Sequence, residues 1–108
     1  MADSVDTTES IPKRRNVRTR EFRYLYGALP ARIRELGVKQ FERFLLDPGH
    51  PSLRLHALKN NSKGAHRDGS FSVSITMQYR ALFFANGAIN VWYWAGTKTD
   101  HDVFAGNR

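Results

Sequence analysis

The side chains that could bind phosphate or move protons are concentrated in the middle of the chain. Residues 48–67, PGHPSLRLHALKNNSKGAHR, contain four cations and three histidines but no acid. A guanidinium pairs bidentately with phosphate, and neighbouring positive charges lower the pKa of a lysine so that it can act as a base near neutral pH. This composition indicates binding of a phosphodiester, or acid–base chemistry on one.

Cleavage of RNA by its own 2′-hydroxyl sets definite requirements. The reaction needs a base near that hydroxyl, cations for the charge that gathers on the phosphoryl oxygens, and an acid for the departing 5′-oxygen. The candidate proton-transfer groups are Lys59, Lys63, His56, His66 and His101, and the candidate phosphate-binding groups are Arg54, Arg67 and Arg80. His56 and Lys63 also count among the RNA-binding groups. The inventory is sufficient for the reaction.

Arg80 interrupts an apolar segment, MQYRALFF at residues 77–84. A buried arginine without a partner is costly, so Arg80 must either pair with an acid or face an anionic ligand. The acids available for pairing are Glu35, Glu42, Asp100 and Asp102. Both interpretations are open at this point.

Each of the other candidates also has a structural alternative. Lys59, Lys63 and Arg67 can decorate a solvated loop around NNSKG, and His56 can be a hydrogen-bonded surface histidine. The DHD sequence at residues 100–102 could suggest a metal, but three adjacent residues of an extended chain do not converge on one ion. We therefore expect no metal and no cofactor.

The composition is that of one globular domain with a basic surface. The chain has 108 residues, of which 41% are hydrophobic, enough to form one core. We expect a single domain over residues 15–108. Residues 1–14 lack apolar periodicity and are expected to be an arm that is disordered or ordered by a partner. Seventeen Lys and Arg against ten Asp and Glu give a net charge of +7, which favours an anionic partner.

Three features bear on the cellular compartment. The chain has no cysteine, which fits a reducing compartment. Its first residues, MADSVDTTES, are polar and acidic and cannot form the apolar core of a secretory signal. No later stretch approaches the roughly 18 apolar residues of a membrane span. We expect a cytoplasmic protein without membrane association.

Apolar periodicity predicts two helices in the first half of the chain. Apolar residues recur at three- and four-residue spacing through EFRYLYGAL, which predicts a helix over residues 20–29 with Thr19 as its cap. A short extended piece around residues 16–18 precedes it. Pro30 suits the first turn of a second helix over residues 31–46, which DPGHP ends.

After Pro51 the apolar period changes from 3.6 to 2. The alternation in LRLHAL and FSVSIT, followed by YRALFFA and INVWYWAG around an Asn-Gly turn signal, predicts strands. Their expected ranges are residues 53–58, 70–76, 79–85 and 88–95. The fold class is therefore α+β, with two N-terminal helices packed on one face of a mainly antiparallel sheet of about four strands.

The other face of this sheet is expected to carry cations, hydroxyls and aromatic rings. By alternation it collects Arg54, His56, Ser72, Ser74 and Arg80. It also receives either Trp92 with Trp94, or Tyr93 with Val91. Such a face suits a nucleic-acid backbone with bases stacked on rings, and it suits an acidic protein segment nearly as well.

The order of these segments resembles a known family. The run DPGHPSLRLHALKNNSKGAHRDGSFSVSITMQYRALFF, followed by VWYWAGTKTDHDVF, is similar to the RelE/ParE superfamily of toxins from bacterial type II toxin–antitoxin systems. The resemblance covers about residues 19–106 and rests on the series as a whole. It implies two helices before a sheet, with Arg80 of QYR on the active face. RelE-like members are ribosome-dependent ribonucleases that cut mRNA without a metal, whereas ParE-like members poison DNA gyrase.

One departure from the family bears on activity. Relatives with a W-I-G-T-H-x-x-Y-D pattern place a histidine after Gly-Thr, where this chain has Lys98 in GTKTDHD. If that histidine is the family's proton donor, Lys98 or His101 must substitute for it. Three hypotheses follow: a ribosome-dependent endoribonuclease toxin, a gyrase-binding toxin without catalysis, or a member that only binds an antitoxin-like partner. The histidines and the acid-free segment favour the first, with a cognate antitoxin, the ribosome and mRNA as partners.

Overall fold

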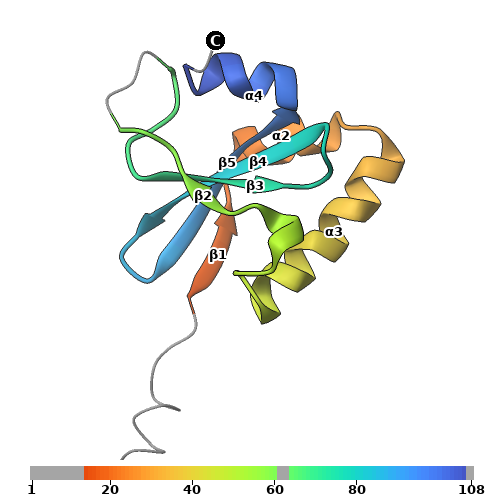
Figure 1. Cartoon of the computed structure of the whole chain (residues 1–108), viewed down its shortest axis with the longest axis horizontal. Coiled ribbons are helices and arrows are strands. Elements are labelled where there is room, and N and C mark those ends of the chain that lie inside the picture. Colours follow the sequence, from red (N-terminus) through yellow and green to blue (C-terminus); the bar gives the residue numbers. More distant parts are fainter. Residues whose placement is uncertain (1–13, 61–63, 107–108) are drawn as a thin grey trace, which may run out of the picture.

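A five-stranded mixed sheet carries helices on both of its faces (Figure 1). The computed structural model describes residues 14–60 and 64–106. The elements are β1 (Arg15–Arg18), α2 (Arg20–Gly27), α3 (Ala31–Leu46), a 3₁₀ turn η1 (Pro51–Leu53), β2 (His56–Ala57), β3 (Ser70–Ser74), β4 (Tyr79–Asn86), β5 (Ile89–Thr97) and α4 (Lys98–Phe104). The strand order is β1-β5-β4-β3-β2, and only the pairing of β1 with β5 is parallel among these strands.

Helices α2 and α3 begin where the sequence predicts. The Thr19 hydroxyl accepts a hydrogen bond from the Phe22 N–H at 3.0 Å, which satisfies one of the free donors of the first turn of α2. Pro30, with φ −56°, precedes the first residue of α3. Both helices contribute to one core with the sheet, in which Phe22 of α2 and Phe44 of α3 meet Phe83 and Trp92. The prediction of an α+β fold is confirmed, and these two helices pack on the same face.

The prediction that helices cover only one face is wrong. Helix α4 lies on the opposite face, where Ala105 and Phe104 pack with Leu58, Leu82 and Trp94. The Thr97 hydroxyl accepts from the Asp100 N–H at 3.1 Å and caps the helix. A helix of seven residues that directly follows a strand has too few turns for its periodicity to stand out in the sequence.

The strand predicted over residues 53–58 is also wrong. Pro51 sits in the first turn of η1, and the His50 side chain accepts a hydrogen bond from the Ser52 N–H. Arg54 then adopts left-handed backbone angles, φ 47° and ψ 40°, so the chain bends where a strand would continue. Only the two residues of β2 pair with β3. The apolar alternation arises because Leu53 and Leu55 both reach the core from this bent segment.

The fifth strand and the strand ends are further differences from the prediction. The extended piece expected around residues 16–18 is β1, which joins the sheet beside β5 and raises the number of strands from four to five. The strand predicted to reach residue 76 ends at Ser74, and the one predicted to end at residue 95 continues to Thr97. Beyond Asn86, the hairpin turns at Gly87 with φ 60°.

A β-bulge in β5 breaks the regular alternation of side chains between the two faces of the sheet. Leu82 pairs with Trp94 while Phe83 pairs with Trp92, which leaves Tyr93 as an extra residue opposite β4. Trp92 consequently faces α2 and α3, whereas Tyr93 and Trp94 both pack on the α4 side. The expectation that Trp92 and Trp94 share a face is therefore wrong.

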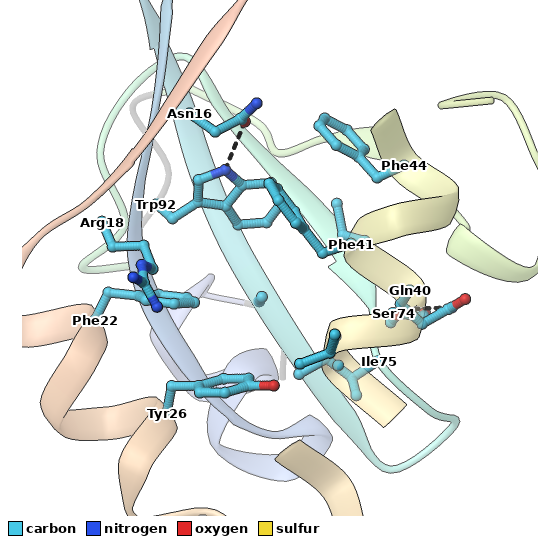
Figure 2. Close-up of a pocket in the computed structure, with 14 residues that line it drawn as sticks. Asn16, Arg18, Phe22, Tyr26, Gln40, Phe41, Phe44, Ser74, Ile75 and Trp92 are labelled. Atoms are coloured by element: carbon cyan, nitrogen blue, oxygen red, sulfur yellow. Dashed lines mark hydrogen bonds between the residues drawn. The ribbon is translucent and has the colours of Figure 1, made fainter. Parts of the chain in front are cut away.

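A pocket of about 430 Å³ lies between α2, α3 and the sheet. Figure 2 shows Trp92, Phe41 and Phe44 on one side of it and Tyr26 with Phe22 on the other. The Tyr26 hydroxyl donates a hydrogen bond to the Arg34 carbonyl, and its ring stacks on Phe22 at a centroid distance of 5.6 Å. The tyrosine is thereby held against α3.

Gly37 is the point on α3 that Tyr26 approaches. A Cβ at Gly37 would collide with the Tyr26 hydroxyl and lie 2.9 Å from its Cε1. We predict that Gly37→Ala lowers the free energy of unfolding by about 1 to 2 kcal/mol, because overpacking outweighs the gain of about 1 kcal/mol in helix propensity. Urea denaturation measures the change.

A second variant separates the clash from other effects. In a Tyr26→Leu background the same alanine should become neutral or stabilising, since the clashing ring is gone. An equal loss from Gly37→Ala in both backgrounds would show that the glycine is needed for another reason.

Candidate functional site

Arg80 lies on the α4 side of the sheet and is only 6% exposed. Its Nη1 donates hydrogen bonds to the carbonyls of Thr76 at 2.6 Å, Met77 at 3.1 Å and Tyr79 at 3.3 Å. Burial lowers the pKa of Arg80, as does the charge of Arg54, while Asp102 raises it. Arg80 is thus held by the β3–β4 turn through carbonyl groups, rather than by a direct ion pair with one of the four acids considered above.

Within the described part of the chain, Nη1 is the donor in every hydrogen bond of the Arg80 side chain. Among the described residues, its Nη2 and Nε have no hydrogen-bond partner. A guanidinium fixed at one nitrogen presents the rest of its fork in a defined direction, which suits recognition of a phosphate. Carbonyl groups of the turn thus take the place of the acid partner, and recognition of an anion by Arg80 stays a prediction.

Five further polar side chains gather around Arg80. They are Arg54, His56, Lys98, His101 and Asp102, and we call the six residues the Arg80 cluster. Lys98 Nζ lies 2.8 Å from Asp102 Oδ2, and the charges of Asp102, Arg80 and His56 all act on His101. The cluster joins the start of α4 to the start of β4 and to the segment from η1 to β2.

His101 connects α4 to the sheet. It is 3% exposed, its Nε2 lies 2.9 Å from Ser72 Oγ and its Nδ1 lies 3.1 Å from Asp102 Oδ1. Since the carboxylate accepts, Nδ1 carries the proton and Nε2 accepts from the Ser72 hydroxyl. Burial lowers the pKa of His101, against the hydrogen bond and charge of Asp102, which raise it.

The order serine, histidine, aspartate is that of a hydrolase triad, but this serine cannot serve as a nucleophile. Ser72 is fully buried at 0% exposure under α4, so a substrate carbonyl cannot reach its oxygen. His101 has a partner at each ring nitrogen. The geometry fits a positioning role, in which the neutral histidine fixes α4 and orients Asp102.

His56 contributes an exposed imidazole ring to the cluster. Its Nδ1 lies 2.8 Å from the Arg54 carbonyl, and a carbonyl only accepts, so Nδ1 carries the proton. Nε2 then carries the lone pair on an exposed ring. This tautomer is the one that a general base requires.

Arg54 occupies a backbone conformation that usually belongs to glycine or asparagine. The left-handed region costs a residue with a Cβ about 1 to 2 kcal/mol, and Arg54 is the only non-glycine with positive φ in the described ranges. Its exposed side chain lies close enough to Arg80 for the two charges to interact. The bend thus brings a second guanidinium to the cluster.

The other candidates lie at the far end of α4. His66 Nε2 donates to the Lys59 carbonyl at 2.7 Å, and the His66 N–H donates to the carbonyl of Phe104, the last residue of the helix. The Arg67 guanidinium lies 4.1 Å from the centroid of the Phe84 ring. Lys63 lies outside the described residues. Helix α4 therefore separates Lys59, His66 and Arg67 from the Arg80 cluster.

The sequence patterns assign neither Asp102 nor Ser72 a part in the chemistry. They offer Asp102 as an ion-pair partner of Arg80 and as part of the DHD sequence, and Ser72 as one hydroxyl on the face of the sheet opposite α2 and α3. The four-residue spacing of Lys98 and Asp102 is the signal for their pair once a helix is recognised at this point. The Ser72–His101 contact joins residues 29 positions apart and has no local signal. Across residues 14–60 and 64–106 no cluster of three His, Cys, Asp or Glu could hold a metal ion, and no helix could span a membrane.

The depressed pKa of His101 predicts acid sensitivity. The unfolded chain binds a proton near the ordinary value of 6.5, whereas the folded protein binds it only at lower pH. The free energy of unfolding should therefore fall as pH drops below about 6.5. Urea denaturation at about pH 7.5 and about pH 5.5 measures this loss.

Two substitutions should change this pH dependence in opposite directions. His101→Gln removes the titrating group and should flatten it. Asp102→Asn removes the carboxylate that favours the charged histidine, so it should steepen the loss. A His101→Gln variant with the full acid-induced loss would assign the effect to another group.

Comparisons with known proteins bear on the fold. No protein-family model and no curated protein matches the chain. Among solved structures, YafQ from E. coli aligns with a TM-score of 0.59 at 12% identity, over 82% of this chain and 97% of that one. The toxin–antitoxin complex RelBE2 from Mycobacterium tuberculosis aligns with a TM-score of 0.53 at 20% identity, over 81% and 100%.

A third similar structure is the YoeB/ParE toxin from Agrobacterium tumefaciens, with a TM-score of 0.58 at 17% identity, over 77% of this chain and 96% of that one. All three chains are covered almost end to end, and all three are too distant in sequence to carry more than a shared architecture. The chain has the fold of the RelE/ParE-like toxins of toxin–antitoxin systems.

Proposed function

We propose that the protein is the toxin of a type II toxin–antitoxin system, a ribosome-dependent endoribonuclease that cleaves mRNA in the cytoplasm without a metal. The observation that carries the proposal is the Arg80 cluster. It combines a braced guanidinium, a second guanidinium at Arg54, a histidine with a free lone pair and a lysine beside a carboxylate. These are the groups that phosphodiester cleavage by a 2′-hydroxyl requires.

Each step of the reaction has a candidate in the cluster. His56 Nε2 takes the proton of the 2′-hydroxyl as its oxygen bonds to phosphorus. Arg80 and Arg54 hold the phosphoryl oxygens as they gain charge, and Lys98 gives a proton to the 5′-oxygen when its bond to phosphorus breaks. The products are a 2′,3′-cyclic phosphate and a 5′-hydroxyl. His101 acts through Asp102, which holds the Lys98 side chain in place by an ion pair.

The residues proposed here to transfer protons are not all of those that the sequence predicted. Lys59 and His66 are left out because they sit at the far end of α4. His101 changes from a proton-transfer group to a positioning residue, because both of its nitrogens are occupied. Lys98 stands in for the histidine that follows Gly-Thr in related toxins.

Arg80→Lys tests the guanidinium while sparing the fold. Lysine can still donate to the turn carbonyls but lacks the fork, so we predict a loss of about 10²- to 10³-fold in cleavage rate with a nearly unchanged melting temperature. Arg80→Ala should also lower the free energy of unfolding by about 2 to 3 kcal/mol, because the turn carbonyls lose their charge-assisted hydrogen bonds. Cleavage of mRNA in a reconstituted translation reaction, paired with thermal melts, measures both.

Induction in cells separates the proposal from its alternatives. The protein alone should arrest growth and leave mRNAs cut within reading frames. Full activity of the Arg80→Lys protein would remove Arg80 from the mechanism. Gyrase-linked DNA breaks with intact mRNA would instead indicate the ParE-like function, and no arrest would indicate a member that only binds a partner.

His56→Asn tests the proposed base against Lys59→Gln, a matched change outside the cluster. Loss of a general base typically costs about 10²- to 10⁴-fold, so we predict that His56→Asn abolishes toxicity and that Lys59→Gln leaves it intact. Plating efficiency after induction and mRNA cleavage report the difference. The reverse pattern would return the role of base to Lys59.

We also propose that a cognate antitoxin restrains the toxin by laying an acidic or amphipathic segment over the Arg80 cluster. Opposite charges across an exposed interface are screened by salt, so its affinity should fall as ionic strength rises. Calorimetric titration of the pair across a salt series measures the dependence. An affinity unaffected by salt, with the cluster still accessible, would contradict neutralisation of charge as the mechanism.

A further inference from the structure

A second basic surface lies beside the Arg80 cluster. A groove of about 560 Å³ runs between α3, the 3₁₀ turn η1 and the turn that joins β3 to β4. Lys39 and Arg43 of α3 and Arg54 after η1 line it, together with the polar side chains of Gln40 and Ser52. No carboxylate is among its lining residues. The groove is therefore positively charged and can donate hydrogen bonds.

The cations of the groove are held by α3 and its contacts. Arg43 Nη1 donates to Gln40 Oε1 at 3.0 Å and to Ser52 Oγ at 2.9 Å. Gln40 Nε2 in turn donates to the Ser74 carbonyl at 2.9 Å, a contact drawn in Figure 2. Lys39 stands one helical turn before Arg43, and residues four apart lie on the same side of a helix.

Ion pairs between described residues leave the charges of the groove unpaired. Within the described part of the chain, none of Lys39, Arg43 and Arg54 takes part in an ion pair. Arg54 also keeps its side chain there at the cost of a left-handed backbone. Unpaired cations that repel one another in one groove favour a polyanionic ligand.

The groove and the Arg80 cluster are two sides of one turn. Thr76 and Met77 line the groove, and their carbonyls accept the hydrogen bonds from Arg80 on the other side. Arg54 belongs to both surfaces, because it lines the groove and its charge acts on Arg80. The cations thus continue from Arg80 through Arg54 to Arg43 and Lys39.

We infer that this groove binds phosphate groups of the RNA strand, namely those adjacent to the scissile phosphate that Arg80 holds. The inference rests on the proposed function and adds to it the path of the substrate. A nucleic-acid strand carries one charge per nucleotide at regular intervals, which suits a row of cations that begins at the cleavage site. Contacts of this kind fix the register of the strand without reading its bases.

The test is binding of a fluorescein-labelled single-stranded RNA of about ten nucleotides to the purified full chain without ribosomes, followed by anisotropy. The double variant Lys39→Gln/Arg43→Gln should weaken binding by about tenfold. It should also reduce the slope of log affinity against log salt by about 1.4, because each phosphate that a cation neutralises on a single strand adds about 0.7 to that slope. Arg20→Gln/Arg23→Gln removes the same charge from exposed positions of α2 and should leave the slope unchanged.

A third variant tests Arg54 without disturbing its backbone. Asparagine accepts left-handed angles, so Arg54→Asn should keep the melting temperature and reduce the salt slope by about 0.7. If the two double variants changed the affinity and the salt slope equally, the inference would be overturned, because RNA affinity would then depend only on the net charge of the protein. So would an absence of RNA binding, or a groove variant that weakens only the binding of an acidic antitoxin.

The outcome is distinguishable from failure of the proposed function. Binding to free RNA does not require cleavage, whereas the proposed function is measured by mRNA cleavage on induction. The groove variant can show the expected reduction in slope while cells show gyrase-linked breaks and intact mRNA. That result would support RNA binding by the groove and contradict the proposed ribonuclease activity. If mRNA is cleaved but both double variants bind RNA alike, the ribonuclease activity is supported and RNA binding by the groove is contradicted.

Discussion

The indole of Trp92 joins most of the elements on the α2/α3 side of the sheet. Its ring lies 4.6 Å from Phe83 of β4, 5.4 Å from Phe44 and 6.0 Å from Phe41 of α3, measured between centroids. Its Nε1 donates to Asn16 Oδ1 at 2.9 Å, which ties β1 to β5. Aromatic groups of this size provide much of the buried area of a small domain. The position of α3, and with it that of Lys39 and Arg43, therefore depends on which way Trp92 points.

That direction is set by the bulge at Tyr93. Because β5 contains one extra residue, Trp92 can face α3 while Trp94 faces α4, and both faces of the sheet receive a large ring. Trp94 stacks on Phe104 at 5.2 Å, and α4 is further held by the hydrogen bond between His101 and Ser72. The Arg80 cluster is assembled at the start of this helix. One irregularity in one strand thus serves the core on one face and the candidate site on the other.

Local patterns in the sequence predict α2, α3, β3, β4 and most of β5, because each has its own periodicity or cap. The errors occur where tertiary contacts override the pattern. Leu53 and Leu55 alternate like a strand but belong to a bend at Arg54, and α4 is too short to be recognised without Leu82 and Trp94 beneath it. The same holds for the site. Residue type and position indicate Arg54, His56 and Arg80, but only the placement of α4 separates Lys59 and His66 from them. No local rule shows that His101 is enclosed by Ser72 and Asp102.

The parallel edge strand has a consequence for how the protein folds during synthesis. β1 is among the first described segments to be made, yet its partner β5 is nearly the last, and the Asn16–Asn90 contact spans 74 positions. Contacts this distant close late, because the entropy of a long loop must be overcome first. Trp92, which completes the core, and α4, which completes the Arg80 cluster, also lie in the final part of the chain. A nascent chain therefore completes the core and the Arg80 cluster only after β5 and α4 have been translated and can pack with segments made earlier.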